Sequence, residues 1–112
     1  MTKVTLKEKL NFKDLEVLQF ELDLFNKYIA IKELHTDFLN TIITFDIVNG
    51  LYFFLRMKLE QEKVEYTISF SICQAATILK CCIFNRTDRG LYTKHVMNKL
   101  KIDLDKQLRD LV

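Results

Sequence analysis

The chain has 112 residues, of which 49% are hydrophobic and 12% aromatic, and its formal net charge at pH 7 is +2. This size and composition exclude wholesale disorder, so we expect residues 1–112 to form a single domain with its own core. The small net charge does not by itself indicate a nucleic acid or a membrane as partner. There is no proline and there are only two glycines. Because multi-stranded domains need many turns built from such residues, the composition favours a few long helices.

The N-terminus and the cysteines indicate where the protein works. The first ten residues, MTKVTLKEKL, carry charge throughout and lack the apolar core of a signal peptide. The apolar run at 38–55 is interrupted by polar residues and is shorter than the ~20 residues that a spanning helix needs. The three cysteines have no repeated spacing that would suggest a disulfide framework. We therefore expect a cytoplasmic protein with no membrane segment.

Two capping boxes open the first predicted helical region. Thr5 and Glu8 are three residues apart, as are Asn11 and Asp14, and either pair can cap the first turn of a helix. Large apolar residues then recur at steps of three and four, which predicts an amphipathic helix that buries Leu15, Leu18, Leu22, Phe25 and Ile29. Residues 18–24 also alternate with period two, as a strand does, but the surrounding Glu, Gln, Leu and Lys favour the helix.

A second helix is predicted over residues 38–63, after a break at 35–37 where Thr36 or Asp37 can act as N-cap. Its expected apolar stripe is Leu39, Ile43, Ile47, Leu51 and Leu55, supplemented by Ile42 and Phe54. An alternative stays open, because Asn49–Gly50 between apolar runs is a strong signal for a hairpin turn. In that alternative, residues 41–72 form an antiparallel three-stranded meander and the fold class is α+β. The strong helix formers at 57–63 favour the helix.

The rest of the chain is predicted to form a short extended segment and further helices. Residues 65–70 are expected to be a loop or a short strand, and Ser69 or Ser71 to cap the next helix. That helix should bury a face made of Ile72, Ala75, Ala76, Leu79 and Ile83. A loop at 85–90 precedes two closing helices, at 91–100 and 104–111, with a break at 101–103. The expected fold class is therefore mainly α, a small helical domain with a C-terminal helix-turn-helix-like segment.

Positive charge is concentrated in residues 80–101. Six basic residues stand there against one acid, a balance of +5, whereas residues 1–79 carry nine bases and eleven acids, a balance of −2. A basic segment on a mildly acidic chain is typical of a surface that faces phosphate groups. The alternative is an ordinary solvated loop and helix face.

The order of elements over residues 38–111 is a long helix, a segment like Ile68–Ser71, the helix at 72–83, and the two closing helices. This order resembles the DNA-binding half of MarR/Sar-type winged-helix regulators, in which a positioning helix precedes a recognition helix. The sequence departs from the pattern of that family at Met97, where a small residue is usual, and at Lys101, where glycine is usual. The chain also ends at Val112, before the wing and the C-terminal dimerisation helices of the family.

The resemblance implies a small DNA-binding transcriptional regulator that docks as a dimer in the major groove of double-stranded DNA. The implied phosphate contacts are Arg86, Arg89, Lys94 and Lys99. The implied base contacts are Lys106, Gln107 and Arg109. The N-terminal helices would supply the dimer interface.

A second functional hypothesis is a non-catalytic helical protein-interaction protein of inhibitor, immunity or scaffold type. It would bind a protein partner through a surface rich in the nine Phe and four Tyr of the chain. An exposed aromatic patch would favour this hypothesis, whereas basic residues gathered on one surface with Lys106 and Arg109 would favour DNA binding.

No catalytic or metal-binding signature is present in the sequence. There is no Gly-rich phosphate loop, nucleophile elbow or paired histidine motif, so we expect neither enzyme activity nor a cofactor. Cys73, Cys81 and Cys82 lack the spacing of zinc ligands. Cys81 or Cys82 would act as a thiol sensor if it were exposed beside Lys80, whose charge would lower the thiol pKa.

Overall fold

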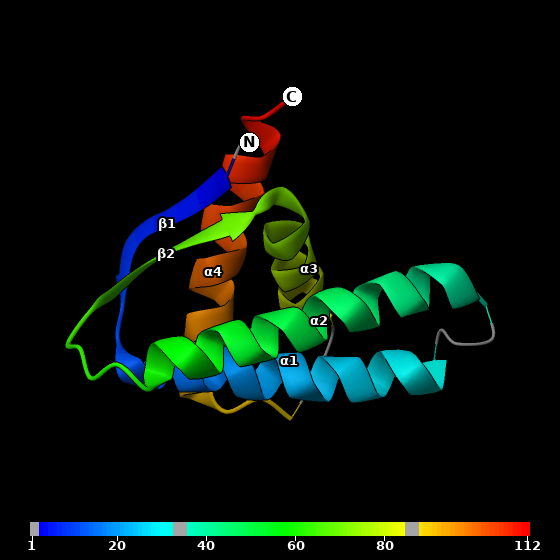
Figure 1. Cartoon of the computed structure of the whole chain (residues 1–112), viewed down its shortest axis with the longest axis horizontal. Helices are drawn as coiled ribbons and strands as arrows, with labels where there is room; N and C mark the ends of the chain where they lie inside the picture. The colour runs from blue at the N-terminus through cyan, green and yellow to red at the C-terminus, as the bar shows by residue number, and fades with distance from the viewer. Residues whose placement is uncertain (1–2, 33–35, 85–87) are drawn as a thin grey trace.

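The computed structural model describes residues 3–32, 36–84 and 88–112, and for residues 3–9 and 30–32 it describes the backbone alone. The elements in chain order are β1 (Lys3–Leu10), α1 (Phe12–Lys32), α2 (Phe38–Leu59), β2 (Tyr66–Ser71), α3 (Ile72–Ile83) and α4 (Leu91–Arg109). Helices α1 and α2 run antiparallel side by side, α3 and α4 stand across them, and the two strands form a ribbon (Figure 1). The mainly helical fold class is thereby confirmed.

Helix α1 begins where the second of the two predicted capping boxes lies. The Asn11 side-chain oxygen accepts a hydrogen bond from the Asp14 amide at 2.8 Å, and the Asn11 amide donates to the Asp14 carboxylate at 3.0 Å. The five predicted core positions of this helix, Leu15 to Ile29, are all buried. The other proposed box, at Thr5 and Glu8, was wrong, because those residues lie in strand β1.

The two strands pair although they are far apart in the sequence. β1 and β2 are antiparallel, with Lys3 opposite Ser71 and Leu6 opposite Ile68, and the register shifts before Leu10 meets Tyr66. β2 buries every second residue, which is the pattern of a strand with one face on the core. Ser71 ends this strand and caps α3 in a reciprocal capping box with Gln74. Of the two caps predicted for this helix, Ser69 and Ser71, the second is therefore the one that forms.

Helix α2 passes through Asn49–Gly50 without interruption, so the meander alternative was wrong. The carboxylate of Asp37 caps the helix by accepting a hydrogen bond from the Asn40 amide at 3.2 Å. The buried face shares Leu51 and Leu55 with the predicted stripe, and its other members are Thr41, Thr44 and Val48. Thr41 can be buried because its hydroxyl donates to the Asp37 carbonyl at 2.8 Å. Leu39 and Ile43, which were expected in the core, are exposed instead.

Helix α3 is also rotated from its prediction. Its buried residues are Ala75, Thr77, Ile78, Cys81 and Cys82, whereas Ile72 and Ile83 at its ends are exposed. The Thr77 hydroxyl donates to the Cys73 carbonyl at 2.8 Å, so this polar residue is satisfied inside the core.

The predicted break at residues 101–103 was wrong, because α4 is one helix from Leu91 to Arg109. Its buried residues Val96, Met97, Leu100 and Leu104 continue the helical spacing straight through that segment. The segment Lys101-Ile102-Asp103 contains neither glycine nor proline and so nothing in it stops a helix. The helix-turn-helix-like pair expected within residues 91–111 is therefore absent from the fold.

Candidate functional site

Arg89 does not face solvent as a phosphate contact would. Its side chain is only 9% exposed, and it forms an ion pair and hydrogen bond with Glu21, which is 1% exposed. A second nitrogen of the guanidinium donates to the Cys81 carbonyl at 3.1 Å. The group thus joins α1, α3 and the segment before α4, and its predicted DNA contact is replaced by an interior role.

A second contact fixes the start of α4 against α1. The Tyr92 hydroxyl donates to the Asp14 carboxylate at 2.5 Å, and the Lys13 ammonium lies 4.4 Å from the centre of the Tyr92 ring. The hydrogen bond to Asp14 raises the pKa of Tyr92 above its ordinary value, since the bond requires the phenol to keep its proton. These contacts set the position of the lysines that follow on α4.

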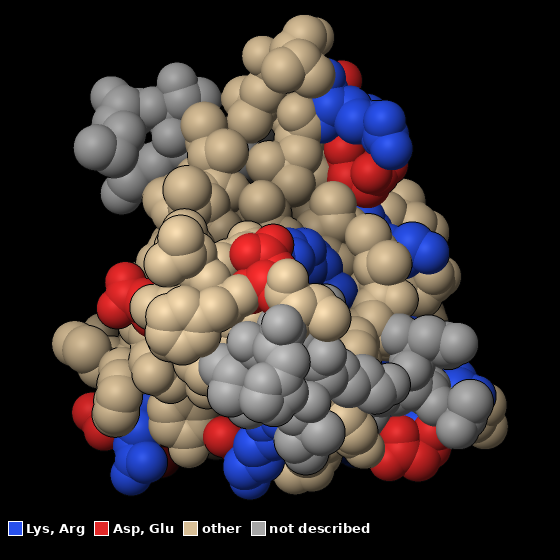
Figure 2. Space-filling view, turned by 90° about the vertical axis from the view of Figure 1, so that its right-hand side faces the viewer, with Lys and Arg blue, Asp and Glu red and all other residues tan. Residues whose placement is uncertain are grey.

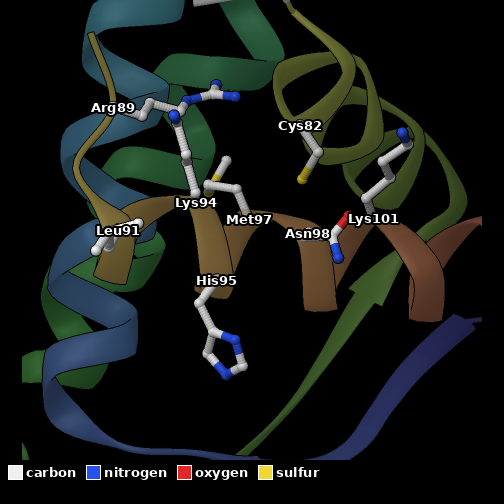
Figure 3. A pocket seen from close by; sticks show the side chains of 8 residues that line it. All are labelled: Cys82, Arg89, Leu91, Lys94, His95, Met97, Asn98 and Lys101. Atoms are coloured by element: carbon white, nitrogen blue, oxygen red, sulfur yellow. The ribbon is translucent and has the colours of Figure 1, made fainter. Parts of the chain in front are cut away.

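A hollow of about 500 Å³ lies beside the first half of α4 (Figure 3). Its lining includes the cationic residues Arg89, Lys94 and Lys101 together with Asn98 and Cys82. In Figure 3 the imidazole of His95 points away from Cys82 and Arg89. Lys94 and Lys101 are exposed, and their seven-residue spacing places them on the same side of the helix.

The remaining predicted DNA contacts of α4 differ in their exposure and in their partners. Lys106 is exposed, but Gln107 is half-buried, because adjacent residues of a continuous helix project about 100° apart. The Arg109 guanidinium binds the Asp105 carboxylate on the same helix at 3.0 Å. Lys99 is half-buried and makes contacts of its own. Arg86, the last predicted contact, lies outside the described residues.

The cysteines do not have the surroundings of a thiol sensor. Cys81 and Cys82 are buried and Cys73 is exposed, and all three are free thiols. Burial raises the pKa of Cys82 from 9.0 to about 12, although the charge of Arg89 acts in the opposite direction. The proposal of an exposed, activated Cys81 or Cys82 is therefore wrong, because the thiolate is the reactive form.

The largest feature that the sequence reasoning missed is the outer face of α2. Six positions of this helix at alternating steps of four and three residues are all exposed: Leu39, Ile43, Asp46, Gly50, Phe53 and Met57. We call them the α2 stripe. Between 59% and 72% of each of its four large apolar side chains is exposed. The signal was present in the sequence, because this spacing is that of a coiled-coil seam.

Charge and hydropathy also describe the surface around the start of α2. The end of the molecule where α2 begins has broad uncharged areas, and its acidic and basic side chains are interspersed without a continuous basic field (Figure 2). Helix α2 is long and apolar enough to cross a membrane, by length and composition only, and 28% of its most apolar window is buried. Core helices of soluble proteins pass the same test.

Among the residues that the structure describes, no group of three or more His, Cys, Asp and Glu side chains could hold a metal ion. Comparison with protein-family models, with curated proteins and with solved structures found no match to this chain. The function is therefore argued from the geometry alone.

Proposed function

We propose that this chain is a non-catalytic protein-interaction protein that binds another polypeptide through the α2 stripe. The observation that carries the proposal is the exposure of Leu39, Ile43, Phe53 and Met57 in one line on a well-formed helix. Large apolar side chains gathered in one line on an exposed face are a mark of interaction sites. A partner helix would meet these residues as knobs at regular spacing.

The magnitude of the available apolar burial supports a specific contact. Complete burial of a Leu, Ile, Phe or Met side chain is worth about 1.5–3 kcal/mol. Since roughly two thirds of each of the four side chains is still exposed, covering them would contribute about 4–8 kcal/mol per chain before the costs of association. A contribution of this size is sufficient for a reversible complex, and the chain need not be permanently bound to its partner.

Asp46 favours a protein over a lipid bilayer as the occupant of this face. The carboxylate lies in the middle of the stripe and is exposed. A charged side chain at the centre of a spanning helix costs about 2.5–3.5 kcal/mol on insertion. A protein partner can offer hydrogen-bond donors to the same carboxylate, so the charge is tolerated there.

Photo-crosslinking in the native cell tests this proposal. A photoreactive amino acid replaces Phe53 on the stripe, or Glu16 as a matched control on the exposed face of α1. We expect a discrete crosslinked species of defined mass from position 53 and none from position 16. Equal labelling at both positions, or none at position 53, would contradict binding through α2.

A second candidate function is DNA binding by α4. The observation that favours it is the placement of four lysines on the two edges of the outer face of this helix: Lys94 and Lys101 on one edge, Lys99 and Lys106 on the other. Phosphates flank a helix on both sides when it lies in the major groove, and His95 and Asn98 lie between the two edges. In this candidate function the helix pair differs from the one that the resemblance to MarR/Sar-type regulators implies. α3 would take the place of the positioning helix, and α4 that of the recognition helix.

Titration of a fluorescent duplex at several salt concentrations tests the second candidate. We expect the affinity to fall steeply with salt, and Lys94→Ala combined with Lys101→Ala to lower the slope of log K against log salt by about 2. Lys27→Ala, on α1, should leave the slope unchanged because Lys27 lies on another helix and pairs with Asp23. An absence of binding at low salt would remove this candidate and would leave the first one intact.

A further inference from the structure

We propose that the partner of the α2 stripe is a second copy of this chain, packed antiparallel through the same stripe. The inference rests on the proposed function and names the partner for it. Three features of α2 support it: the order of residues along the helix, the charges at its two ends, and Gly50.

The stripe has the symmetry that an isologous contact requires. When two such helices pack antiparallel about Val48, the midpoint of Leu39 and Met57, each position meets a defined one in the second copy. Leu39 then lies opposite Met57, and Ile43 lies opposite Phe53. Large apolar side chains therefore meet large apolar side chains towards both ends of the seam.

The centre of the stripe fits the same arrangement. Asp46 of one copy lies opposite Gly50 of the other, where no side chain occupies the space. Asn49 stands beside that glycine and is exposed. Its side-chain oxygen accepts a hydrogen bond from the side-chain amide of Asn26 at 3.4 Å, so the NH₂ group of Asn49 is the part that can donate to the incoming carboxylate. The one charged residue of the stripe thus has a polar neighbour in the complex.

Gly50 is not explained by the fold of the single chain. A Cβ atom built at this position meets no other atom within 4 Å, and the residue lies inside a helix, where glycine is disfavoured. The missing side chain does, however, let a second backbone approach closely. A residue that lowers helix stability and leaves space only on the outer face indicates that something packs against that face.

The charges of α2 favour antiparallel over parallel pairing. Asp37 and Asp46 lie in the first part of the helix and its cap, whereas Arg56 and Lys58 lie in the last turn. Antiparallel packing brings the acidic part of one copy to the basic part of the other, and it also opposes the two helix dipoles. Parallel packing would stack Asp46 on its own equivalent.

The area of the stripe defines how strong the dimer can be. Leu39 and Met57 are about 27 Å apart along the axis, at 1.5 Å per residue, and a helix is roughly 10 Å wide. The contact is therefore well below the ~800 Å² per partner of a standard interface. We expect a dissociation constant in the micromolar range or weaker, so the oligomeric state must be measured over a range of concentrations.

Sedimentation equilibrium of the purified full chain is the first measurement. We expect the mass to rise from that of the 13.3 kDa monomer towards twice that value as the concentration increases. Ile43→Glu should weaken the dimer at least ~100-fold, because each carboxylate would face Phe53 of the other copy. Leu91→Glu is the matched control, since Leu91 is 88% exposed on α4 and should leave the dimer unchanged. A chain that stays monomeric at millimolar concentration overturns the inference.

Cysteine pairing then tests the register. All variants carry Cys73→Ser, which removes the exposed native thiol. On mild oxidation, a mixture of Ile43→Cys and Phe53→Cys chains should form the disulfide-linked dimer, and either variant alone should form little. Efficient linkage of one variant with itself indicates parallel or unspecific contact and overturns the inference.

The two proposals fail in different ways. If the purified chain is monomeric but Phe53 crosslinks to a larger species in the cell, the partner is another protein and only the self-association is wrong. If the monomer instead sediments with neutral lipid vesicles and position 53 gives no protein crosslink, a membrane covers α2 and both proposals are wrong.

Discussion

Glu21 and Arg89 form a buried ion pair that connects helix α1 to the segment before helix α4, 68 residues later in the chain. Neither side chain is more than 9% exposed, and Arg89 also donates to the carbonyl oxygen of Cys81 at the end of α3. Arg89 thus serves to hold three parts of the fold together.

Replacement of Arg89 by Met should destabilise the protein by about 3–5 kcal/mol, because it leaves the carboxylate of Glu21 buried without its counter-ion. The measurement is chemical denaturation of the wild-type and variant chains. Arg109→Met is the matched control, since its partner Asp105 is 44% exposed, and an exposed pair contributes at most about 1 kcal/mol. Equal effects of the two variants would contradict the structural role of Arg89.

The pKa of Cys82 predicts how stability depends on alkaline pH. In the folded chain burial raises it from 9.0 to about 12, so between these values the unfolded chain loses a proton that the folded chain keeps. Stability from this group is therefore fully present below pH 9 and is lost as the pH rises towards 12. We expect the free energy of unfolding to fall by a few kcal/mol across this window, and Cys82→Ala should make it depend less on pH.

The burial of Cys82 also predicts that a thiol reagent labels Cys73 fast and Cys82 only after unfolding.

Proline substitution tests the continuity of α4. Ile102 is 62% exposed within the helix, in the segment where the sequence predicts a break between two helices. Ile102→Pro should destabilise the fold by about 3 kcal/mol or more, since it removes a helix hydrogen bond and clashes with the preceding turn. Ile102→Ala should change the stability by less than about 0.5 kcal/mol. If both variants were equally stable, residues 101–103 would form a turn.

The two glycines of the chain should respond oppositely to alanine. Gly50→Ala should stabilise the monomer by about 1 kcal/mol, because Gly50 lies inside α2 with open space around its Cβ position. Gly90 is the N-cap of α4, where alanine is a poorer residue, so Gly90→Ala should be neutral or slightly destabilising. Thermal denaturation at a concentration that keeps the chain monomeric checks both. A destabilised Gly50→Ala variant would mean that α2 itself requires the glycine.

Local signals in the sequence were sufficient for most element types. The stripe of α1 was predicted correctly, and the caps at Asn11, Asp37 and Ser71 were each one of two predicted candidates, because both features depend on neighbours within four residues. Strand β1 was missed, because its partner lies some 60 residues away and a local match to a capping box competed with it. In the first half of α2 the buried face was predicted wrongly, because apolar residues lie on all sides of this helix and its buried threonines look polar in the sequence.

The candidate site depended on tertiary structure more than the fold did. The residues next to Arg89 in the sequence do not indicate that its side chain pairs with Glu21 in the core. Likewise Lys106 and Gln107 are neighbours in the chain but project to different sides of a continuous helix. The outer stripe of α2 was visible as a heptad spacing, but only its exposure distinguishes a docking face from a core face.

The pairing of β1 with β2 has a consequence for synthesis on the ribosome. Lys3 pairs opposite Ser71, so the first strand emerges with no partner while more than sixty further residues are added. At 5–20 residues per second this interval lasts roughly 3–13 seconds. During that time α1 and α2 can already pack on each other, since both precede β2. During this interval the nascent chain therefore carries an unpaired β-strand, open to chaperones or to neighbouring nascent chains on the same message.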